Sequence, residues 1–163
     1  MVEDRFVADV GAFHAKFGLD AQEPSVPTVP TDEMLGFRLN FMLEELAEIA
    51  AAHDFVIEVQ EDGDVKFVKI DEDIRENMSD ASKLEDSLDG LVDLLYVLMG
   101  TVRFMGFHTS SPHGQRFHEA WRRVQQANMA KVRASDPTAS KRGTSLDVVK
   151  PVGWVPPNLR DLV

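Results

Sequence analysis

The sequence contains no cysteine, and this absence excludes several kinds of site. Without thiols the chain can form no disulfide, no zinc site with cysteine ligands and no cysteine nucleophile. It also lacks a basic segment followed by an apolar one near its start, and no apolar run approaches the roughly 20 residues that cross a bilayer. We therefore expect a cytoplasmic protein that has no membrane partner.

Basic residues are scarce as well. The 163 residues include 17 Lys and Arg against 28 Asp and Glu, which gives a net charge of −11. Proteins that bind DNA or RNA without sequence preference rely on clustered Lys and Arg, so this balance argues against a nucleic-acid partner. A nucleotide can still bind where a metal and a few local cations offset its charge.

Apolar spacing and turn signals predict the elements of one domain that spans residues 1–163. Four helices are expected, at about 2–17, 31–53, 80–105 and 111–134. Thr31 or Asp32 can cap the second, and Ser111 followed by Pro112 is typical of the start of the fourth. The expected core stripe of the second helix is Leu35, Leu39, Met42, Leu46 and Ile49. Residues 71–79 are expected to be irregular. Residues 55–60 and 65–70 lie on either side of an Asp-Gly pair, which is typical of a β-hairpin. We expect an all-α core of four or five helices with this hairpin inserted. A helix and a Pro-rich connector fill residues 1–30, and 135–163 form an extended tail.

The third predicted helix carries apolar residues on nearly every side. One stripe consists of Leu84, Leu88, Leu91, Leu95, Leu98 and Val102. A helix that is apolar all round is usually buried all round, so we expect neighbours to cover it. Because a single layer of neighbours would leave part of it exposed, we expect a homo-oligomer, either a dimer or a tetramer.

Acidic residues gather in two of the predicted helices. They are Glu44, Glu45 and Glu48 in the second helix and Asp86, Asp89 and Asp93 in the third. Glu45 and Glu48 are three residues apart, so both side chains can reach one ion. The aspartates fall within roughly 60° of each other around their helix. A simpler alternative is that the glutamates form a solvated helix face.

The aspartates favour a cation between the two helices. Asp is a poor helix former, and like charges on the most apolar helix of the chain repel each other unless a cation lies between them. Two facing acidic stripes would supply about four to six oxygen ligands, which suits octahedral Mg²⁺ or Mn²⁺. The sequence therefore predicts a divalent-metal site.

The acidic motifs resemble those of a known family. Glu44-Glu45-x-x-Glu48, followed by a motif that ends in Asp93-Leu-Leu-Tyr96, resembles the MazG-like all-α nucleoside triphosphate pyrophosphohydrolases. The motif Asn128-Met-Ala-Lys131 and the tail Lys150-Pro-x-x-Trp154-x-Pro-Pro resemble the viral, single-domain branch of that family. One departure is Gly90, which stands where the family has a Glu three residues before Asp93. Both Asp86 and Asp89 stay open as replacements for that ligand.

The resemblance implies a reaction and a set of residue roles. The reaction is hydrolysis between the α and β phosphates, with Mg²⁺ as cofactor and Mn²⁺ able to substitute for it. The implied ligands are Glu45, Glu48, Asp89 and Asp93, with Asp86 as the alternative. One of Glu44, Glu45 and Glu48 would orient or deprotonate the attacking water. Asn128 and Lys131 would face the β and γ phosphates, although by themselves they are more typical of an ordinary exposed helix end.

Residues of the tail add further candidates. Lys141, Arg142 and Lys150 are candidate phosphate ligands, and Trp154 can either stack on a base or dock the tail. Within the viral branch, the chain is most similar to enzymes that convert dGTP and GTP to monophosphates for 2-aminoadenine nucleotide synthesis, which would act in the host cytoplasm. Two alternatives stay open: a house-cleaning hydrolase for other or damaged nucleotides, and a non-enzymatic helical interaction module.

Overall fold

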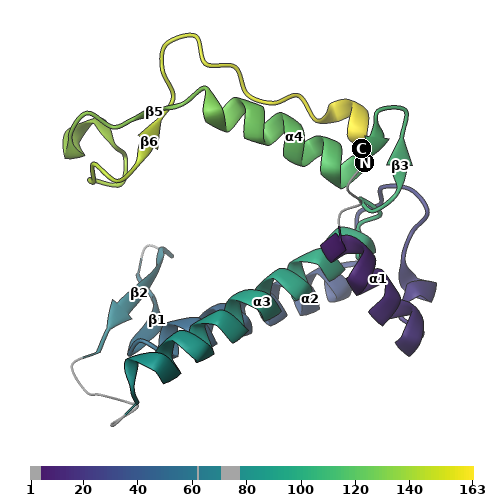
Figure 1. Ribbon diagram of the computed structural model, residues 1–163, viewed down its shortest axis with the longest axis horizontal. Coiled ribbons are helices and arrows are strands. Elements are labelled where there is room, and N and C mark those ends of the chain that lie inside the picture. Colours follow the sequence, from purple (N-terminus) through teal and green to yellow (C-terminus); the bar gives the residue numbers. More distant parts are fainter. Residues whose placement is uncertain (1–4, 62, 71–77) are drawn as a thin grey trace. The chain divides into compact units, whose positions relative to one another are not determined.

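The computed structural model describes residues 5–61, 63–70 and 78–163 (Figure 1). The chain divides into two compact units, one of Met1–Pro24 with Thr28–Met105 and one of Ser25–Pro27 with Gly106–Val163. The described residues form mainly helices, with small two-stranded antiparallel pairs, in agreement with the expected helical class. Among them, no helix combines the length and the apolar character needed to span a membrane. The single-domain organisation stays a prediction.

The first unit is built on an antiparallel pair of long helices, α2 (Asp32–Ala51) and α3 (Asp80–Phe104), against which α1 (Arg5–Phe17) packs (Figure 1). Thr31 caps α2, as its position predicts, because its Oγ1 accepts a hydrogen bond from the Met34 N–H at 3.2 Å. Gly18, with φ of 71°, ends α1. The expected connector after it contains a short 3₁₀ helix, η1 (Asp20–Gln22).

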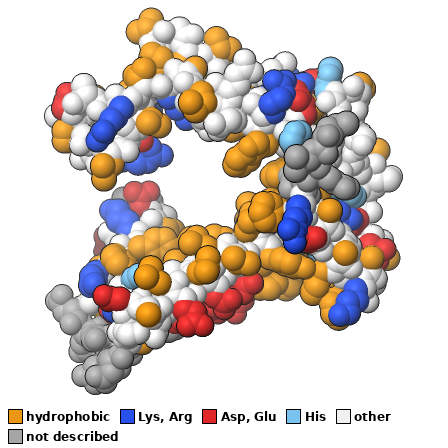
Figure 2. Space-filling view, viewed as in Figure 1, with side chains coloured by type: hydrophobic (Ala, Val, Ile, Leu, Met, Phe, Trp, Pro, Cys, Tyr) orange, Lys and Arg blue, Asp and Glu red, His pale blue; other side chains and the backbone are white. Residues whose placement is uncertain are grey.

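The apolar stripes do not mark the buried faces of these helices. In α2 the buried side chains include Arg38 and Glu45, whereas Leu39 is 54% exposed. In α3 the buried residues gather in the C-terminal half, and Leu84, Leu88, Leu91, Val92 and Leu98 are exposed. Within the single chain, α1 and α2 therefore cover only part of α3, and its burial on all sides stays a prediction that concerns an oligomer. Figure 2 shows apolar side chains along α2 and α3 and acidic ones along the lower edge of the same helices.

The predicted hairpin is present between α2 and α3. Strand β1 (Phe55–Val59) pairs antiparallel with β2 (Val65–Lys69), and Ile57 lies opposite Phe67. Gly63, with φ of 85°, provides the left-handed turn residue that the Asp-Gly pair predicts. The irregular segment expected at 71–79 lies mostly outside the described residues.

The second unit is organised around α4 (Arg116–Met129), which is shorter than predicted at both ends. Ser111 does not cap it; its hydroxyl donates to the Gly114 carbonyl at 3.0 Å and closes the turn between β3 (Ser110–Ser111) and β4 (Gly114–Gln115). After α4, β5 (Val132–Arg133) pairs with β6 (Val148–Val149), so the chain leaves the helix to form this ladder.

The last residues of the chain run back along α4 (Figure 1). Trp154 Nε1–H donates to the Ala127 carbonyl at 2.8 Å. Near the C-terminus, Arg123 donates to both carboxylate oxygens of Asp161, at 2.6 and 2.9 Å. The segment predicted to be extended also contains two short 3₁₀ helices, η2 (Pro137–Ala139) and η3 (Arg160–Leu162). These contacts hold the tail on the helix.

Candidate active site

A glycine brings the two acidic helices together. A Cβ atom placed on Gly90 would lie 2.7 Å from Cγ1 of Ile49 and 3.6 Å from the carbonyl oxygen of Glu45. The backbone of α3 therefore approaches α2 more closely than any larger residue allows. This explains why a glycine occupies the position where the resemblance leads one to expect a glutamate. It also places Asp89 and Asp93, which flank Gly90, beside the glutamates of α2.

The acidic residues of α2 and α3 gather around Glu45, which is only 8% exposed. The pKa of Glu45 is raised, first because burial disfavours its charged form and then because Glu48, Asp93, Glu44 and Asp89 repel that charge. Four carboxylates from two helices therefore act on the charge of Glu45, and we call these five residues the acidic cluster. The pattern in the sequence predicted this gathering.

The composition of the acidic cluster fits a hard divalent cation. Within the described parts of the chain, no Lys or Arg forms an ion pair with any of its members. No three acidic or histidine side chains among the described residues are already close enough together to hold an ion. Like carboxylates without a cation repel one another, so their side chains are expected to stay apart until one binds. An oxygen-only donor set with a buried member is the chemistry that Mg²⁺ and Mn²⁺ prefer.

The choice between Asp86 and Asp89 also has a structural basis. Asp89 is one of the groups whose charge raises the pKa of Glu45. Asp86 is half-buried and has a partner of its own. The electrostatics therefore favour Asp89 as the ligand that replaces the expected glutamate.

The predicted phosphate ligands lie in the second unit, and two of them meet at Trp154. The ammonium nitrogens of Lys150 and Lys131 lie 4.5 and 5.9 Å from the centroid of the Trp154 ring. Both lysines also line a pocket of about 500 Å³, together with Lys141 and Arg142. Arg142 is paired with Asp147 at 2.7 Å, while the three lysines form no ion pair within the described residues. This basic pocket is unusual in a protein with a net charge of −11.

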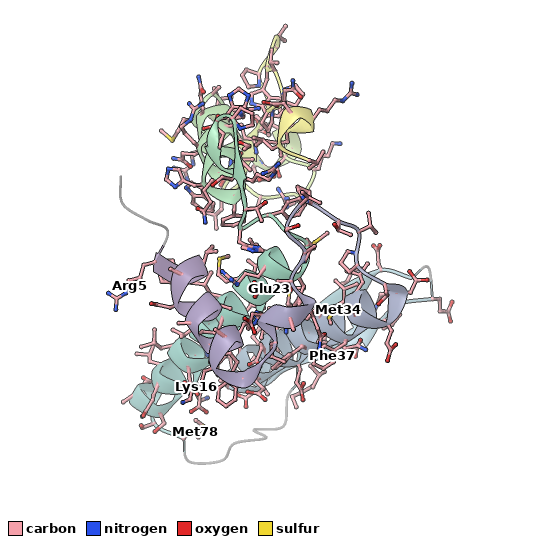
Figure 3. All side chains as sticks on the ribbon, turned by 90° about the vertical axis from the view of Figure 1, so that its right-hand side faces the viewer. Arg5, Lys16, Glu23, Met34, Phe37 and Met78 are labelled. Atoms are coloured by element: carbon pink, nitrogen blue, oxygen red, sulfur yellow. The ribbon has the colours of Figure 1, made fainter. Side chains whose placement is uncertain are left out.

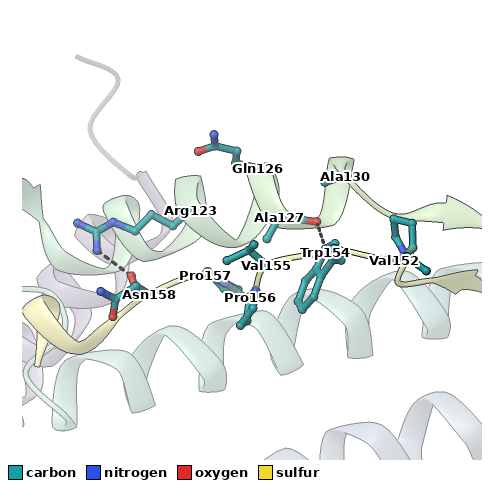
Figure 4. Close-up of a pocket in the computed structure, with 12 residues that line it drawn as sticks. Arg123, Gln126, Ala127, Ala130, Val152, Trp154, Val155, Pro156, Pro157 and Asn158 are labelled. Atoms are coloured by element: carbon teal, nitrogen blue, oxygen red, sulfur yellow. Dashed lines mark hydrogen bonds between the residues drawn. The ribbon is translucent and has the colours of Figure 1, made fainter.

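Asn128 and Trp154 do not form a phosphate site together with the lysines of the basic pocket. Asn128 is exposed at the end of α4 and lines neither the basic pocket nor the larger pocket beside it. That larger pocket, of about 650 Å³, lies between α4 and the tail (Figure 4). Trp154 lines it, and its indole N–H is bonded to Ala127, so the ring is held in place from one end. The ring thus docks the tail, as one of the two interpretations of Trp154 requires.

Sequence reasoning missed Arg38. Its guanidinium is buried against α3, donating from Nε to the Thr101 hydroxyl at 3.2 Å and from Nη2 to the Val97 carbonyl at 2.5 Å. A single charged residue in a helix forms no recognisable sequence motif. The signal available in the sequence was spacing: Arg38 stands seven residues, about two turns, before Glu45 and therefore lies on the same side of α2.

Comparison with known families agrees with this architecture. The model of the family described as phosphoribosyl-ATP pyrophosphohydrolase matches residues 10–128, which include all of α2, α3 and the acidic cluster. The chain belongs to the phosphoribosyl-ATP pyrophosphohydrolase family, within the MazG-like helical superfamily. Members of the family are pyrophosphohydrolases and generally depend on a divalent metal. The match ends before Lys131, Lys150 and Trp154, and no curated protein is a significant match to the chain.

Proposed function

We propose that the chain is a Mg²⁺-dependent nucleoside triphosphate pyrophosphohydrolase that cleaves between the α and β phosphates. The observation that carries this proposal is the acidic cluster, in which four carboxylates surround the buried Glu45 and no cation of the described chain forms an ion pair with any of the five. Membership of a pyrophosphohydrolase family supports it. Such chemistry requires mainly positioning and charge neutralisation, which the cluster can provide by holding a metal.

The acidic residues share two tasks in this proposal, metal binding and activation of water. Glu45, Glu48, Asp89 and Asp93 would hold the ion, which would supply charge neutralisation of the phosphates. Mn²⁺ can take the place of Mg²⁺. One of the glutamates at 44, 45 and 48 accepts a proton from the attacking water, so that hydroxide attacks the α phosphorus and pyrophosphate leaves. The products are a nucleoside monophosphate and pyrophosphate.

The proposed substrates are dGTP and GTP. This part rests on the resemblance of the motifs around Asp89–Tyr96, Asn128–Lys131 and Lys150 to MazZ, the viral enzyme that supplies dGMP for 2-aminoadenine nucleotide synthesis. The basic pocket supports a phosphate-binding role for Lys131 and Lys150, because its lysines have no carboxylate partner within the described chain. Asn128 would act as a donor at the helix end. The site of action would be the cytoplasm of the infected host.

The protein is further proposed to act as a homo-oligomer, a dimer or a tetramer. The exposed apolar side chains of α3 support this, since Leu84, Leu88 and Leu91 are 68%, 65% and 55% exposed. A contiguous apolar stripe of this kind is typical of a surface that another chain covers. No nucleic acid and no membrane is part of the proposal.

A second candidate substrate follows from the family. Its description names phosphoribosyl-ATP, which also carries a triphosphate and would release pyrophosphate by the same chemistry. A house-cleaning activity on other or damaged nucleotides would use the same cluster as well. A non-enzymatic interaction module, in contrast, would need the acidic residues only for solubility.

One assay separates these functions. Purified protein and Mg²⁺ are mixed with each of the common ribo- and deoxyribonucleoside triphosphates and with phosphoribosyl-ATP, and pyrophosphate release is measured. We expect release from dGTP and GTP above all, and none from Asp93→Asn. Equal rates on every base would remove the MazZ-like function in favour of house-cleaning, and a preference for phosphoribosyl-ATP would favour the second candidate. Orthophosphate as product, or no turnover of any substrate, would contradict the proposal itself.

A further inference from the structure

The first unit contains an aromatic pocket that none of the roles above uses. It has a volume of about 280 Å³ and lies among α1, the segment after it, α2 and α3. Its aromatic walls are Phe13, Phe37, Phe41, Tyr96 and Phe104. Figure 3 shows Met34 and Phe37 projecting from α2 at this end of the unit. The volume is just below the range of about 300–1,000 Å³ that is typical of small-molecule sites, so it suits one part of a nucleotide rather than the whole.

Arg38 lines this pocket and has no carboxylate partner among the described residues. Its guanidinium carbon lies 5.5 Å from the Phe104 ring centroid, 5.6 Å from that of Phe41 and 5.9 Å from that of Phe37. Of its five N–H groups, the bonds to Thr101 and Val97 use two. The remaining N–H groups have no acceptor in the described part of the chain. Burial alone lowers the pKa of Arg38, and no neighbouring charge opposes that shift.

The neighbouring arginine shows how the same unit satisfies a buried guanidinium when its role is structural. Arg103 forms a two-pronged bond to Glu23, at 2.7 and 2.6 Å, and a third bond to the Val7 carbonyl. Glu23 also contacts His14 Nδ1 at 2.5 Å. Arg38 differs because its bonds to α3 leave N–H donors that no described residue accepts from. None of its atoms belongs to the fully buried atoms that lack a partner in the described chain, so these donors are open to the pocket that Arg38 lines. A purely structural role therefore accounts for only some of the hydrogen-bond donors of Arg38.

The pocket and the acidic cluster lie on the same pair of helices. Phe41 precedes Glu45 by four residues on α2, and Tyr96 follows Asp93 by three residues on α3. At a rise of about 1.5 Å per residue, the pocket begins roughly one helical turn, about 5 Å, from the acids. A nucleotide whose base enters the pocket would thus direct its phosphates towards the acidic cluster.

We propose that this pocket binds the base of the substrate and that Arg38 selects a 6-oxopurine by donating to its O6 and N7. This inference rests on the proposed pyrophosphohydrolase function and names the group that sets its base specificity. A guanidinium matches the two acceptors O6 and N7 of guanine, whereas a 6-aminopurine presents an N–H₂ donor in place of O6. Against Arg38 that donor would leave buried N–H groups of both partners unpaired. The aromatic rings supply apolar and stacking contacts for any base.

The first test changes the substrate and leaves the protein unaltered. Values of kcat/KM are measured for dGTP, dITP, 7-deaza-dGTP, dATP and the 2-aminoadenine deoxynucleotide. We expect dITP to resemble dGTP, because it keeps O6 and N7. Loss of N7 in 7-deaza-dGTP should lower kcat/KM roughly tenfold, and the 6-amino substrates should be poorer by about 10- to 100-fold. A 6-aminopurine turned over as well as dGTP would overturn the inference.

The second test changes Arg38. Arg38→Gln should lower kcat/KM for dGTP without a similar loss for dATP, so that the preference for dGTP falls by roughly tenfold or more. Arg5→Gln on α1 is the matched control, because Arg5 is exposed and, among the described residues, forms its ion pair with Asp9 on the same helix. An unchanged preference in a folded Arg38→Gln would overturn the inference. If that variant does not fold, the 7-deaza-dGTP result decides.

Binding of the product separates this inference from the proposed function. Calorimetric titration with dGMP and with dAMP in EDTA needs neither metal nor turnover. We expect dGMP to bind the unaltered protein more tightly than dAMP, and Arg38→Gln to lose that difference. Equal binding of the two, or no binding, overturns the role of Arg38 even if pyrophosphate is released. Tighter dGMP binding with no release from any triphosphate would instead contradict only the catalytic function.

Discussion

Gly90→Ala tests how closely α3 must approach α2 at the acidic cluster. The added Cβ would lie 2.7 Å from Ile49 Cγ1, where ordinary contacts are 3.4–4 Å. Overpacking of this kind costs about 1–3 kcal/mol, whereas alanine in place of glycine inside a helix gains about 0.5–1 kcal/mol. We therefore expect Gly90→Ala to be destabilised by up to about 2.5 kcal/mol, and its Mn²⁺ affinity to fall because Asp89 and Asp93 shift away from Glu45.

A second glycine provides the matched control. Gly36 lies within α2, and a Cβ atom there would meet nothing within 4 Å. Gly36→Ala should therefore gain only the stability that alanine has over glycine inside a helix. Urea denaturation of both variants in EDTA measures the difference, expected to be about 1–3 kcal/mol. Ile49→Ala in the Gly90→Ala background should recover part of the loss, because it removes the clashing atom. Equal stability of the two alanine variants would refute the close approach at Gly90.

Two further predictions concern charge. Without metal, Glu45→Gln should have a larger free energy of unfolding than the unaltered protein at neutral pH, because the raised pKa of Glu45 reflects a charge that burial and its neighbours disfavour. Addition of Mg²⁺ should raise the melting temperature of the unaltered protein but not that of Glu45→Gln. In the second unit, hydrogen bonds from Arg122 and Arg123 lower the pKa of Glu119 from 4.5 to about 2. Its stabilisation is present above pH 4.5 and is lost as the pH falls towards 2, so Glu119→Gln should show a weaker pH dependence of unfolding over that window.

Signals that are local in the sequence predicted the local structure well. Thr31 caps α2 because its hydroxyl reaches an N–H three residues on, and the hairpin forms because its Asp-Gly pair allows a tight turn. Ser111 with the proline after it looks equally typical of a helix start. However, Gly114 lies three residues on and accepts a bond from the Ser111 hydroxyl, which closes a turn instead. A short motif of this kind is compatible with a helix start or with a turn, and the pairing of β3 with β4 determines which one forms.

The packing of the helices could not be predicted from apolar periodicity. The pattern places Leu39 and Leu46 of α2 in the core, whereas α3 covers the side that carries Arg38 and Glu45. The chain has more apolar stripes than it has neighbours to cover them, so periodicity alone does not say which stripe is buried. For the candidate site, the acidic residues formed a recognisable pattern in the sequence. Arg38, in contrast, can be identified only once the structure shows the pocket that it lines.

The central claim is that the acidic cluster around Glu45 holds a divalent metal. Calorimetric titration with Mn²⁺ of the unaltered protein, Glu45→Gln and Asp93→Asn tests it most directly, with Glu33→Gln near the start of α2 as a control. Saturable binding is predicted for the unaltered protein and the control. Affinity should fall by roughly 10-fold or more in the other two variants, since each removes a charged ligand. No saturable binding, or binding unchanged by Asp93→Asn, would contradict the claim.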